Sequence, residues 1–439
     1  MSLDKKITRR EFIEKSTLGT AGLTIASTFG VPALLTNPNP SDVIGIGMVG
    51  IGIRGSSLLR QIMNVSGTQV RGVCDAYTPY LERAANTVKG DNPDVISYVD
   101  YHDLMRNKNI DAVIIATPDH LHAPVSIAAA EAGKDIYVEK PLTRTIPEAI
   151  NLVNAVKKNK RVLQLGHGAR SSPSNWRARE IYKSGMFGHV TLVRTSMFRN
   201  SASGAWVYNI PPEAGPDSVD WGRFLENAPE KRTFDLDRFF RWRKYWDYGT
   251  GVAGDMFSHS YDAVNFILDL GIPKTCVANG GVYYWKEKRE VPDVFNAVWD
   301  YPDRGLALTF NSTFSNSSQG VETGTQIFGD KASYTRGRVF LEPSTDRNRE
   351  IIEKLREERI KKGEEIGERE AIPVYTYTRE DGLYFTSHMQ NFIDCVRSRQ
   401  KPRCHEDVAL EEAVTCIMSV IAYKEGRRVT WDPVKQEVV

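Results

Sequence analysis

The stretch VIGIGMVGIGIRG, residues 43–55, decides the fold of the N-terminal part of the chain. Its first half is an apolar run typical of a buried strand, and a GxGxxG pattern follows at once. A helix is predicted over residues 56–63, so the glycines lie in the strand–turn–helix setting in which this motif binds a dinucleotide. Gly50 permits the tight turn, Gly52 lets the backbone approach a pyrophosphate, and Gly55 allows close packing of helix and strand.

A second predicted strand, residues 69–74, ends at Asp75, about 20–25 residues after the glycines. An acidic side chain at this place can hydrogen-bond the ribose 2′-hydroxyl of NAD and repel the 2′-phosphate of NADP. NAD is therefore favoured over NADP, although Arg54 offers a partner for a phosphate. We expect Ile53 and Arg54 to contact the cofactor together with the glycines and Asp75.

Strands and helices alternate after this point, which predicts an α/β fold with a doubly wound parallel sheet. In chain order the predicted elements are strand 111–117, helix 123–132, strand 135–138, helix 146–158 and strand 161–165. The ligand of such a sheet lies at the carboxyl ends of its strands. The further candidate cofactor contacts near those ends are Thr117, His122, Glu139 and Lys140.

The pattern changes after Gly168, where strands follow one another without intervening helices. They indicate a second domain of α+β type with a large, mostly antiparallel open sheet. The charged stretch 346–370 is predicted to be a solvated helix. We divide the chain into residues 1–40 as signal and linker, 41–167 as the NAD-binding Rossmann domain, and 168–439 as the substrate-binding and oligomerisation domain. The predicted strands of the last part are residues 189–198, 275–285, 296–299, 306–314 and 324–328.

Residues 1–40 are predicted to be an export signal. The pair Arg9 and Arg10 precedes Phe12, and a weakly apolar stretch follows over residues 17–35. This layout resembles a twin-arginine signal, which implies the twin-arginine export machinery as a partner and a periplasmic or exported location. A basic tail and an uncleaved membrane anchor are the alternatives. The twin-arginine route carries folded proteins, often with the cofactor already bound.

Composition argues against several classes of protein. The 439 residues include 57 Lys and Arg and 55 Asp and Glu, a net charge of +2, so no nucleic-acid partner is expected. Hydrophobic residues make up 41 % of the chain, which is enough for buried cores. Five scattered cysteines without CxxC or HExxH indicate neither a disulfide scaffold nor a zinc site. The pair His120 and His122 is weak support for a metal, and no metal is predicted.

These motifs together resemble the Gfo/Idh/MocA oxidoreductase family, which includes glucose–fructose oxidoreductase and inositol dehydrogenase. The resemblance rests on the glycine-rich turn, Asp75, ATPDHLHA at residues 116–123, AGKDIYVEKPL at 132–142 and the D-x-x-x-H-x-x-D segment that begins at Asp255. It covers almost all of residues 43–433. It implies hydride transfer between a secondary alcohol of a sugar, glycoside or polyol and a tightly bound nicotinamide cofactor.

By this resemblance, Lys140, Asp255 and His259 match the family's catalytic positions. Asp255 and His259 are four residues apart in a predicted helix, so both side chains are expected on one face. Oxidation of an alcohol requires a base for the hydroxyl proton, and histidine has a suitable pKa. Lys140 can polarise the same oxygen. Which of Lys140 and His259 is the base stays open at this point.

Candidate substrate contacts are Arg170, Trp242 and Arg243, because aromatic faces stack on sugars and arginines bond their hydroxyls. Core packing explains the aromatic residues equally well. We expect a carbohydrate or polyol substrate and a homodimer or homotetramer formed through the open sheet.

Export would leave little free NAD(H) to recycle, so a closed reaction cycle is expected. One such cycle oxidises a sugar and reduces a second carbonyl compound. The other belongs to NAD-dependent glycosidases, which oxidise a substrate transiently, eliminate the leaving group, add water and reduce the product again. The lysine of Glu139-Lys140-Pro141 favours the oxidoreductase, because the glycosidases tend to lack it. A nucleotide-binding sensor or scaffold without activity is the third alternative.

Overall fold

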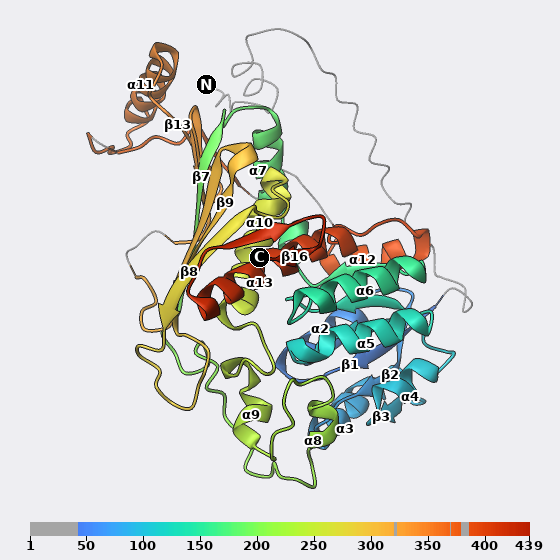
Figure 1. The fold of residues 1–439 in the computed structure, drawn as a ribbon. Helices are drawn as coiled ribbons and strands as arrows, with labels where there is room; N and C mark the ends of the chain where they lie inside the picture. The colour runs from blue at the N-terminus through green and yellow to red at the C-terminus, as the bar shows by residue number, and fades with distance from the viewer. Residues whose placement is uncertain (1–42, 320–322, 369, 379–385) are drawn as a thin grey trace.

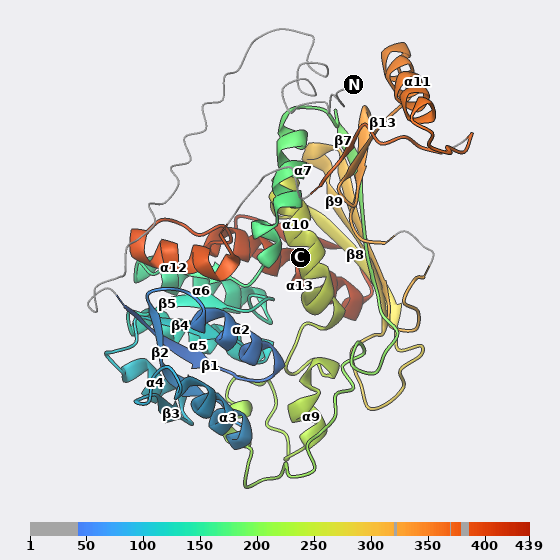
Figure 2. The ribbon, with the colours of Figure 1, turned by 180° about the vertical axis from the view of Figure 1, so that it is seen from behind.

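The computed structural model describes residues 43–319, 323–368, 370–378 and 386–439, so the predicted export signal lies outside the described residues. Figures 1 and 2 show the molecule from opposite sides. A parallel sheet wrapped by helices forms one end, and a larger sheet with helices against one of its faces forms the other.

The N-terminal sheet has six parallel strands in the order β3-β2-β1-β4-β5-β6, which confirms the predicted doubly wound fold. All six residues of β1 are buried, as a central strand covered on both faces requires. The strands are β1 (Ile44–Val49), β2 (Thr68–Cys74), β3 (Ile96–Tyr98), β4 (Ala112–Ile115), β5 (Asp135–Val138) and β6 (Leu163–Leu165). The helices between them are α2 (Ile53–Met63), α3 (Thr78–Val88), α4 (Tyr101–Arg106), α5 (Asp119–Glu131) and α6 (Ile146–Lys158).

The strand order reverses between β1 and β4, and ligands of open α/β sheets bind in the crevice beside such a reversal. The candidate cofactor residues follow β1, β2, β4 and β5, so the topology collects them at one edge of the sheet.

Helix α12 (His388–Ser398) completes the N-terminal domain although it lies near the end of the chain. Its apolar side chains Met389, Phe392 and Ile393 share one buried core with residues of β1 and β2. The sequence did not predict this return, because an amphipathic helix does not specify which sheet it covers.

The second sheet has ten strands in the order β14-β13-β12-β11-β7-β10-β9-β8-β15-β16. Only the neighbours β7 and β10 run parallel among its pairs of described strands, which confirms a mostly antiparallel sheet. Its strands are β7 (Val190–Phe198), β8 (Thr275–Gly281), β9 (Val294–Tyr301), β10 (Leu306–Thr313), β11 (Gln326–Gly329), β12 (Ala332–Thr335), β13 (Arg338–Leu341), β14 (Tyr375–Thr376), β15 (Val429–Asp432) and β16 (Glu437–Val438).

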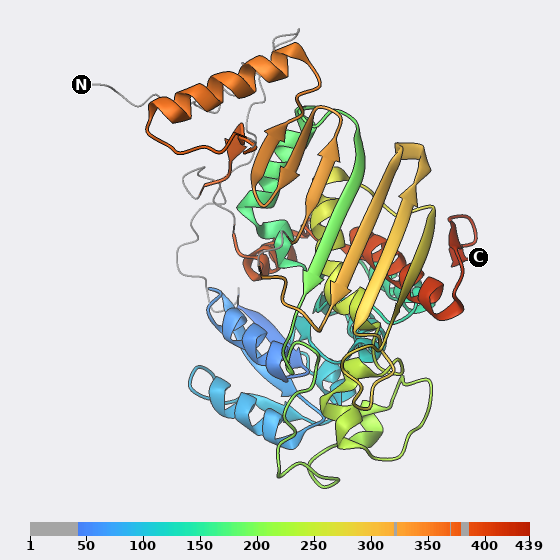
Figure 3. The ribbon, with the colours of Figure 1, turned by 90° about the vertical axis from the view of Figure 1, so that its left-hand side faces the viewer.

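Three helices lie against one face of this sheet: α7 (Pro173–Lys183), α10 (Ser258–Leu268) and α13 (Glu406–Glu425). Buried and less buried positions alternate along β10, so one face of the strand packs on these helices. The opposite face faces the viewer in Figure 3, and no helix crosses it there.

Helix α11 (Asp346–Lys361) projects from the body of the molecule, and none of its residues is buried (Figure 1). The solvated helix that the charge pattern predicted is thus present, but it ends at Lys361 and not near residue 370. Among the described residues, no helix combines the length and the apolar character that a membrane span requires.

A segment between β7 and α10 reaches from the large sheet to the N-terminal domain, with the short helices α8 (Trp221–Phe224) and α9 (Leu236–Phe240). Val219 forms a β-bridge with Tyr77, just after the candidate ribose ligand Asp75. Phe224 accepts a hydrogen bond at its carbonyl oxygen from the His120 ring, with 2.6 Å between the atoms. The segment therefore contacts the N-terminal domain at the sheet edge that carries the candidate cofactor residues.

Candidate active site

The three glycines of the turn meet three different environments. Gly50 has φ +83°, and a Cβ there would stand 2.7 Å from the backbone nitrogen of Thr117. A Cβ on Gly55 would stand 2.0 Å from the carbonyl oxygen of Gly50. On Gly52, by contrast, a Cβ would meet only the Tyr80 ring at 3.8 Å. The backbone is thus open above Gly52 alone, and no side chain caps the start of α2, so the turn fits a pyrophosphate.

Asp75 holds this turn in place. Its carboxylate accepts the backbone N–H groups of Ile51 at 2.5 Å and Tyr77 at 2.8 Å. Burial raises the pKa of Asp75 to about 6, and these hydrogen bonds oppose the rise. The carboxylate lies beside the glycine-rich turn, and its contact with a ribose stays a prediction.

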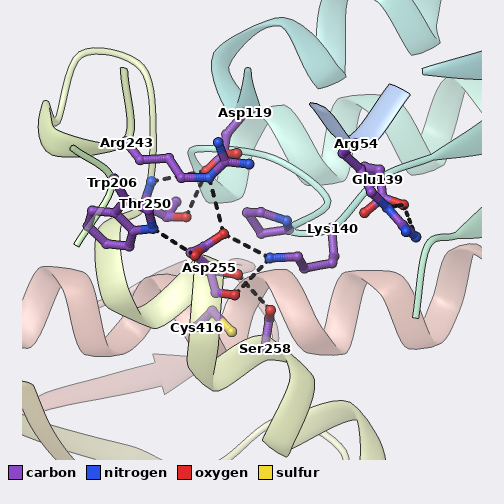
Figure 4. A network of polar contacts seen from close by, with 12 residues as sticks. Arg54, Asp119, Glu139, Lys140, Trp206, Arg243, Thr250, Asp255, Ser258 and Cys416 are labelled. Atoms are coloured by element: carbon purple, nitrogen blue, oxygen red, sulfur yellow. Dashed lines mark hydrogen bonds and ion pairs between the residues drawn. The ribbon is translucent and has the colours of Figure 1, made fainter. Parts of the chain in front are cut away.

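Ile53 and Arg54 follow the open glycine. Ile53 is 73 % exposed, which leaves an apolar surface beside the turn for a planar ring to cover. Arg54 donates through Nε to Oε1 of the buried Glu139 over 2.7 Å. One ion pair therefore joins two predicted cofactor residues, Arg54 at the start of α2 and Glu139 directly after β5 (Figure 4).

Thr117 and the two histidines of ATPDHLHA lie at the end of β4. The Oγ1 atom of Thr117 is buried and has no hydrogen-bond partner among the described residues, as an atom waiting for a ligand would be. His122 lies behind it, with its ring nitrogens 2.7 Å from the Pro141 carbonyl oxygen and 3.0 Å from that of Thr117. The rings of His120 and His122 each contact backbone carbonyl oxygens, so both histidines stabilise the surrounding loops.

Asp255 is the centre of the second half of the site (Figure 4). Lys140 Nζ lies 3.0 Å from its Oδ1 and 2.7 Å from its backbone carbonyl oxygen. Arg243 Nε donates to the same Oδ1 at 3.2 Å, and Trp206 Nε1 donates to Oδ2 at 3.0 Å. Burial by itself raises the pKa of Asp255, but the nearby cations outweigh it and hold that pKa well below the usual range. Asp255 is therefore a fixed carboxylate that positions its neighbours.

Asp255 and His259 stand at a change of helix type. Asp255 lies in the π-helical turn η4 (Ala253–Phe257), and His259 is the second residue of α10. Gly254 allows this packing, because a Cβ there would stand 1.8 Å from Thr250 Oγ1. The predicted helix is present, but its first turn is wider than an α-turn, a feature frequent at functional sites.

His259 keeps an exposed surface, although protein atoms surround much of its ring. This partial desolvation, with the positive charge of Lys140 nearby, lowers the pKa of His259 below its ordinary value. The imidazole is neutral near pH 7 and can accept a proton, whereas Lys140 Nζ donates to Asp255. The sequence left open which of the two is the base, and the engagement of Lys140 by Asp255 makes His259 our candidate.

Three buried groups at this site were not predicted. His167 lies with its ring centroid 5.7 Å from that of His259, and its Nε2 is 3.7 Å from Oε1 of the fully buried Glu412. Asp119 accepts the Thr250 backbone N–H at 3.2 Å and its hydroxyl at 3.1 Å. Burial raises the pKa of Asp119 to about 7. His167 follows β6 and Asp119 follows β4, so the rule on carboxyl ends of strands could have found both.

The candidate substrate residues separate into two groups. Arg170 is only 5 % exposed, and its Nε lies 2.5 Å from Asp262 Oδ1, so it stands behind the site. Arg243 lies with its guanidinium 4.1 Å from the centre of the Trp242 ring and also binds Asp255. Arg243 thus lies beside Asp255 with Trp242 against its guanidinium, whereas Arg170 is buried against Asp262.

Two family models match the chain. Residues 44–167 match the oxidoreductase family with an NAD-binding Rossmann fold, and residues 218–431 match the C-terminal alpha/beta domain of the same family. The chain belongs to the Gfo/Idh/MocA oxidoreductase family.

Curated relatives match a part of the chain. Inositol 2-dehydrogenase of Salmonella paratyphi B is 36 % identical over 149 residues, which is 34 % of this chain and 44 % of the relative. A glycosyl hydrolase family 109 protein of Shewanella putrefaciens is 29 % identical over 203 residues, which is 42 % of this chain and 44 % of the relative. The chain thus matches less than half the length of these relatives.

Several solved structures have the same fold as this chain over most of their own length. The WlbA dehydrogenase of Bordetella pertussis, in complex with NADH and UDP-GlcNAcA, has a TM-score of 0.64 at 17 % identity, over 89 % of this chain and 99 % of that one. A levoglucosan dehydrogenase in complex with NADH and levoglucosan has a TM-score of 0.62 at 18 % identity, over 88 % and 99 %. At these identities the likeness shows the fold alone.

Proposed function

We propose that this protein is an NAD-dependent oxidoreductase that transfers hydride between a secondary alcohol of a sugar, glycoside or polyol and a tightly bound nicotinamide cofactor. The observation that carries the proposal is the ion pair between Lys140 and Asp255, which lies four residues before His259. Lys140 follows β5 at the same edge of the sheet as the turn that is open above Gly52. Family membership supports NAD as the cofactor.

Bound NAD would supply a hydride acceptor at its nicotinamide ring. The glycine-rich turn and the start of α2 would hold its pyrophosphate, and Thr117 Oγ1 would offer it a hydrogen bond at the end of β4. Lys140, fixed by Asp255, polarises the substrate hydroxyl, and His259 Nδ1 or Nε2 takes its proton. In the reverse direction the imidazolium returns that proton to the carbonyl oxygen.

An NAD-dependent glycosidase is the second candidate, and the matched stretch of the family 109 protein supports it. Both candidates begin with the same oxidation, so the reaction centre serves either. The lysine at position 140 favours the oxidoreductase.

We further propose an exported enzyme that acts as a homodimer or homotetramer. The arginine pair in residues 1–40 supports export. The bare face of the large sheet, with the exposed side chains Val277 on β8 and Val298 on β9, supports association through that face (Figure 3). Sedimentation velocity of the purified chain, with Val298→Lys as the variant, measures the oligomeric state.

The function is tested with the freshly purified full chain. Denaturation should release NAD that mass spectrometry identifies, and sugars should reduce the bound cofactor in a single turnover that absorbance at the nicotinamide band follows. Aryl glycosides separate the two candidates, because steady aglycone release without net NADH formation belongs to the glycosidase. A protein that contains no nucleotide and shows no thermal shift with added NAD would contradict both.

A further inference from the structure

Three cations surround the single carboxylate of Asp255. Lys140 and Arg243 bind Oδ1, and the terminal nitrogen NH1 of Arg199 lies 3.8 Å from Oδ2. These cationic side chains are 10 %, 28 % and 33 % exposed, in the order Lys140, Arg243 and Arg199, so water screens them only in part. The sequence analysis did not single out Arg199.

The neighbouring groups do not cancel this surplus of positive charge. Arg54 and Glu139 neutralise each other, and so do Arg170 and Asp262. Glu412 faces His167 and the Leu142 backbone N–H, and no ion pair joins it to Lys140, Arg199 or Arg243 among the described residues. Asp119, the other carboxyl group whose pKa responds to Arg243, has a pKa raised by burial, so it carries only part of a negative charge near pH 7. This surplus of positive charge is unfavourable because little water is present to solvate it, and a bound anion would neutralise it.

Both arginines keep donors for such a ligand. Arg243 uses Nε for Asp255 and stacks on Trp242, and its terminal nitrogens donate to none of the residues that the structure describes. Arg199 makes one long hydrogen bond, 3.4 Å from NH1 to the Gly204 carbonyl oxygen. Arg199 also acts on the reaction centre itself, since its charge lowers the pKa values of Asp255 and His259. A planar guanidinium is suited to the two oxygens of a carboxylate.

We propose that the substrate is a sugar acid, whose carboxylate binds Arg199 and Arg243 while a secondary hydroxyl lies between Lys140 and His259. This rests on the proposed oxidoreductase function and names its substrate class. The ion pairs with Asp255 hold both guanidinium groups in place, so the site is arranged before the substrate arrives.

The test compares sugars with a similar ring that carry a carboxylate, its neutral ester or a phosphate. Glucuronate and its methyl ester share every hydroxyl, and glucose 6-phosphate presents a different anion on a similar ring. Single-turnover reduction of the bound cofactor gives the rate with each compound, and titration calorimetry on the full chain gives the affinity without turnover. We expect glucuronate to exceed its ester by about tenfold or more in both measurements, as for a hydrogen bond to a charged group.

Two variants assign the effect to Arg199. Arg199→Gln should reduce the preference for the acid, measured as the ratio of its rate or affinity to that of the ester, by about tenfold. Arg199→Lys should retain part of this preference, because the charge stays although the planar pair of donors is lost. Arg427→Gln is the matched control, since Arg427 pairs with Glu425 on the surface. Thermal melting of each variant verifies that it folds.

Each outcome decides between defined alternatives. Equal rates and affinities for the acid and its ester, or an unchanged ratio in Arg199→Gln, would overturn the sugar-acid proposal while the oxidoreductase function stands. Preference for glucose 6-phosphate would overturn the sugar-acid proposal in favour of a sugar phosphate as the substrate class. If the sugar screen reduces the cofactor but glucuronate does not, the sugar-acid proposal fails while the oxidoreductase function stands, and if no sugar reduces it, the proposed function itself fails.

Discussion

The glycine-rich turn and the cluster around Asp255 are built in opposite ways. The turn comes from a few consecutive residues, and its shape follows from backbone geometry at Gly50 and Gly55. The cluster joins residues 140, 199, 206, 243 and 255 from separate elements, and opposite charges hold it together. The proposed cofactor site thus rests on a local motif, whereas the proposed substrate site depends on how distant segments of the chain pack.

The largest expected effect is on the chemical step. His259→Ala should lower the rate of cofactor reduction by about 10²–10⁴, because the base for the hydroxyl proton is lost. NAD affinity should stay within about twofold of that of the original protein, since His259 belongs to the cluster and not to the turn. Stopped-flow absorbance and titration calorimetry measure the two quantities. Lys140→Ala should also lose rate, and original rates in both variants would contradict the assignment.

A matched pair of substitutions tests the turn. Gly52→Ala should fold with nearly unchanged melting temperature but bind NAD at least about tenfold more weakly, because its methyl group enters the space open to the pyrophosphate. Gly55→Ala should lower the melting temperature itself, because its Cβ meets the Gly50 carbonyl oxygen. Differential scanning fluorimetry with and without NAD separates the two outcomes. Equal behaviour of both variants would remove the distinction between the glycines.

Asp119, which binds Thr250 near the cluster, predicts a dependence of stability on pH. Burial raises its pKa in the folded chain to about 7, above the unfolded value, so the folded state binds its proton more tightly. This contribution to stability is fully present below about pH 4 and is lost as pH rises toward 7.

Asp119→Asn removes that dependence and retains an acceptor for Thr250. Between pH 5 and pH 7, the free energy of unfolding of the original chain should fall relative to that of the variant by at most about 1.4 kcal/mol per pH unit. Urea denaturation at several pH values measures the difference. A constant difference across this range would show that Asp119 titrates normally.

The smallest expected effect belongs to Trp206. Trp206→Phe removes the N–H donor to Asp255 Oδ2 and should lower kcat by about threefold to tenfold with little change in KM. The pH profile of kcat should shift as well, which loss of packing alone would not cause. Trp221→Phe is the control, because it also removes an indole hydrogen bond, here to the Arg232 carbonyl oxygen. Equal losses of kcat in the two variants would show that Trp206 contributes through packing and not through its hydrogen bond.

Sequence patterns predicted the elements whose signal is local. Apolar runs indicated the buried strands β1, β4 and β5, and charge indicated the exposed helix α11. They did not predict that β8 ends at Gly281, that α12 covers the first sheet, or that Asp255 lies in a π-helical turn. Those features depend on contacts between distant segments, and no residue spacing encodes them.

The amino-acid sequence by itself determined the parallel sheet, the glycine-rich turn and the residue types for proton transfer, because each follows from backbone geometry or side-chain chemistry within a short stretch. Only the tertiary structure decided that Asp255 stays charged, that His259 is neutral, and that Arg199 joins them. The physical reason is that desolvation and Coulomb interactions depend on distances in space, which the folded chain alone defines.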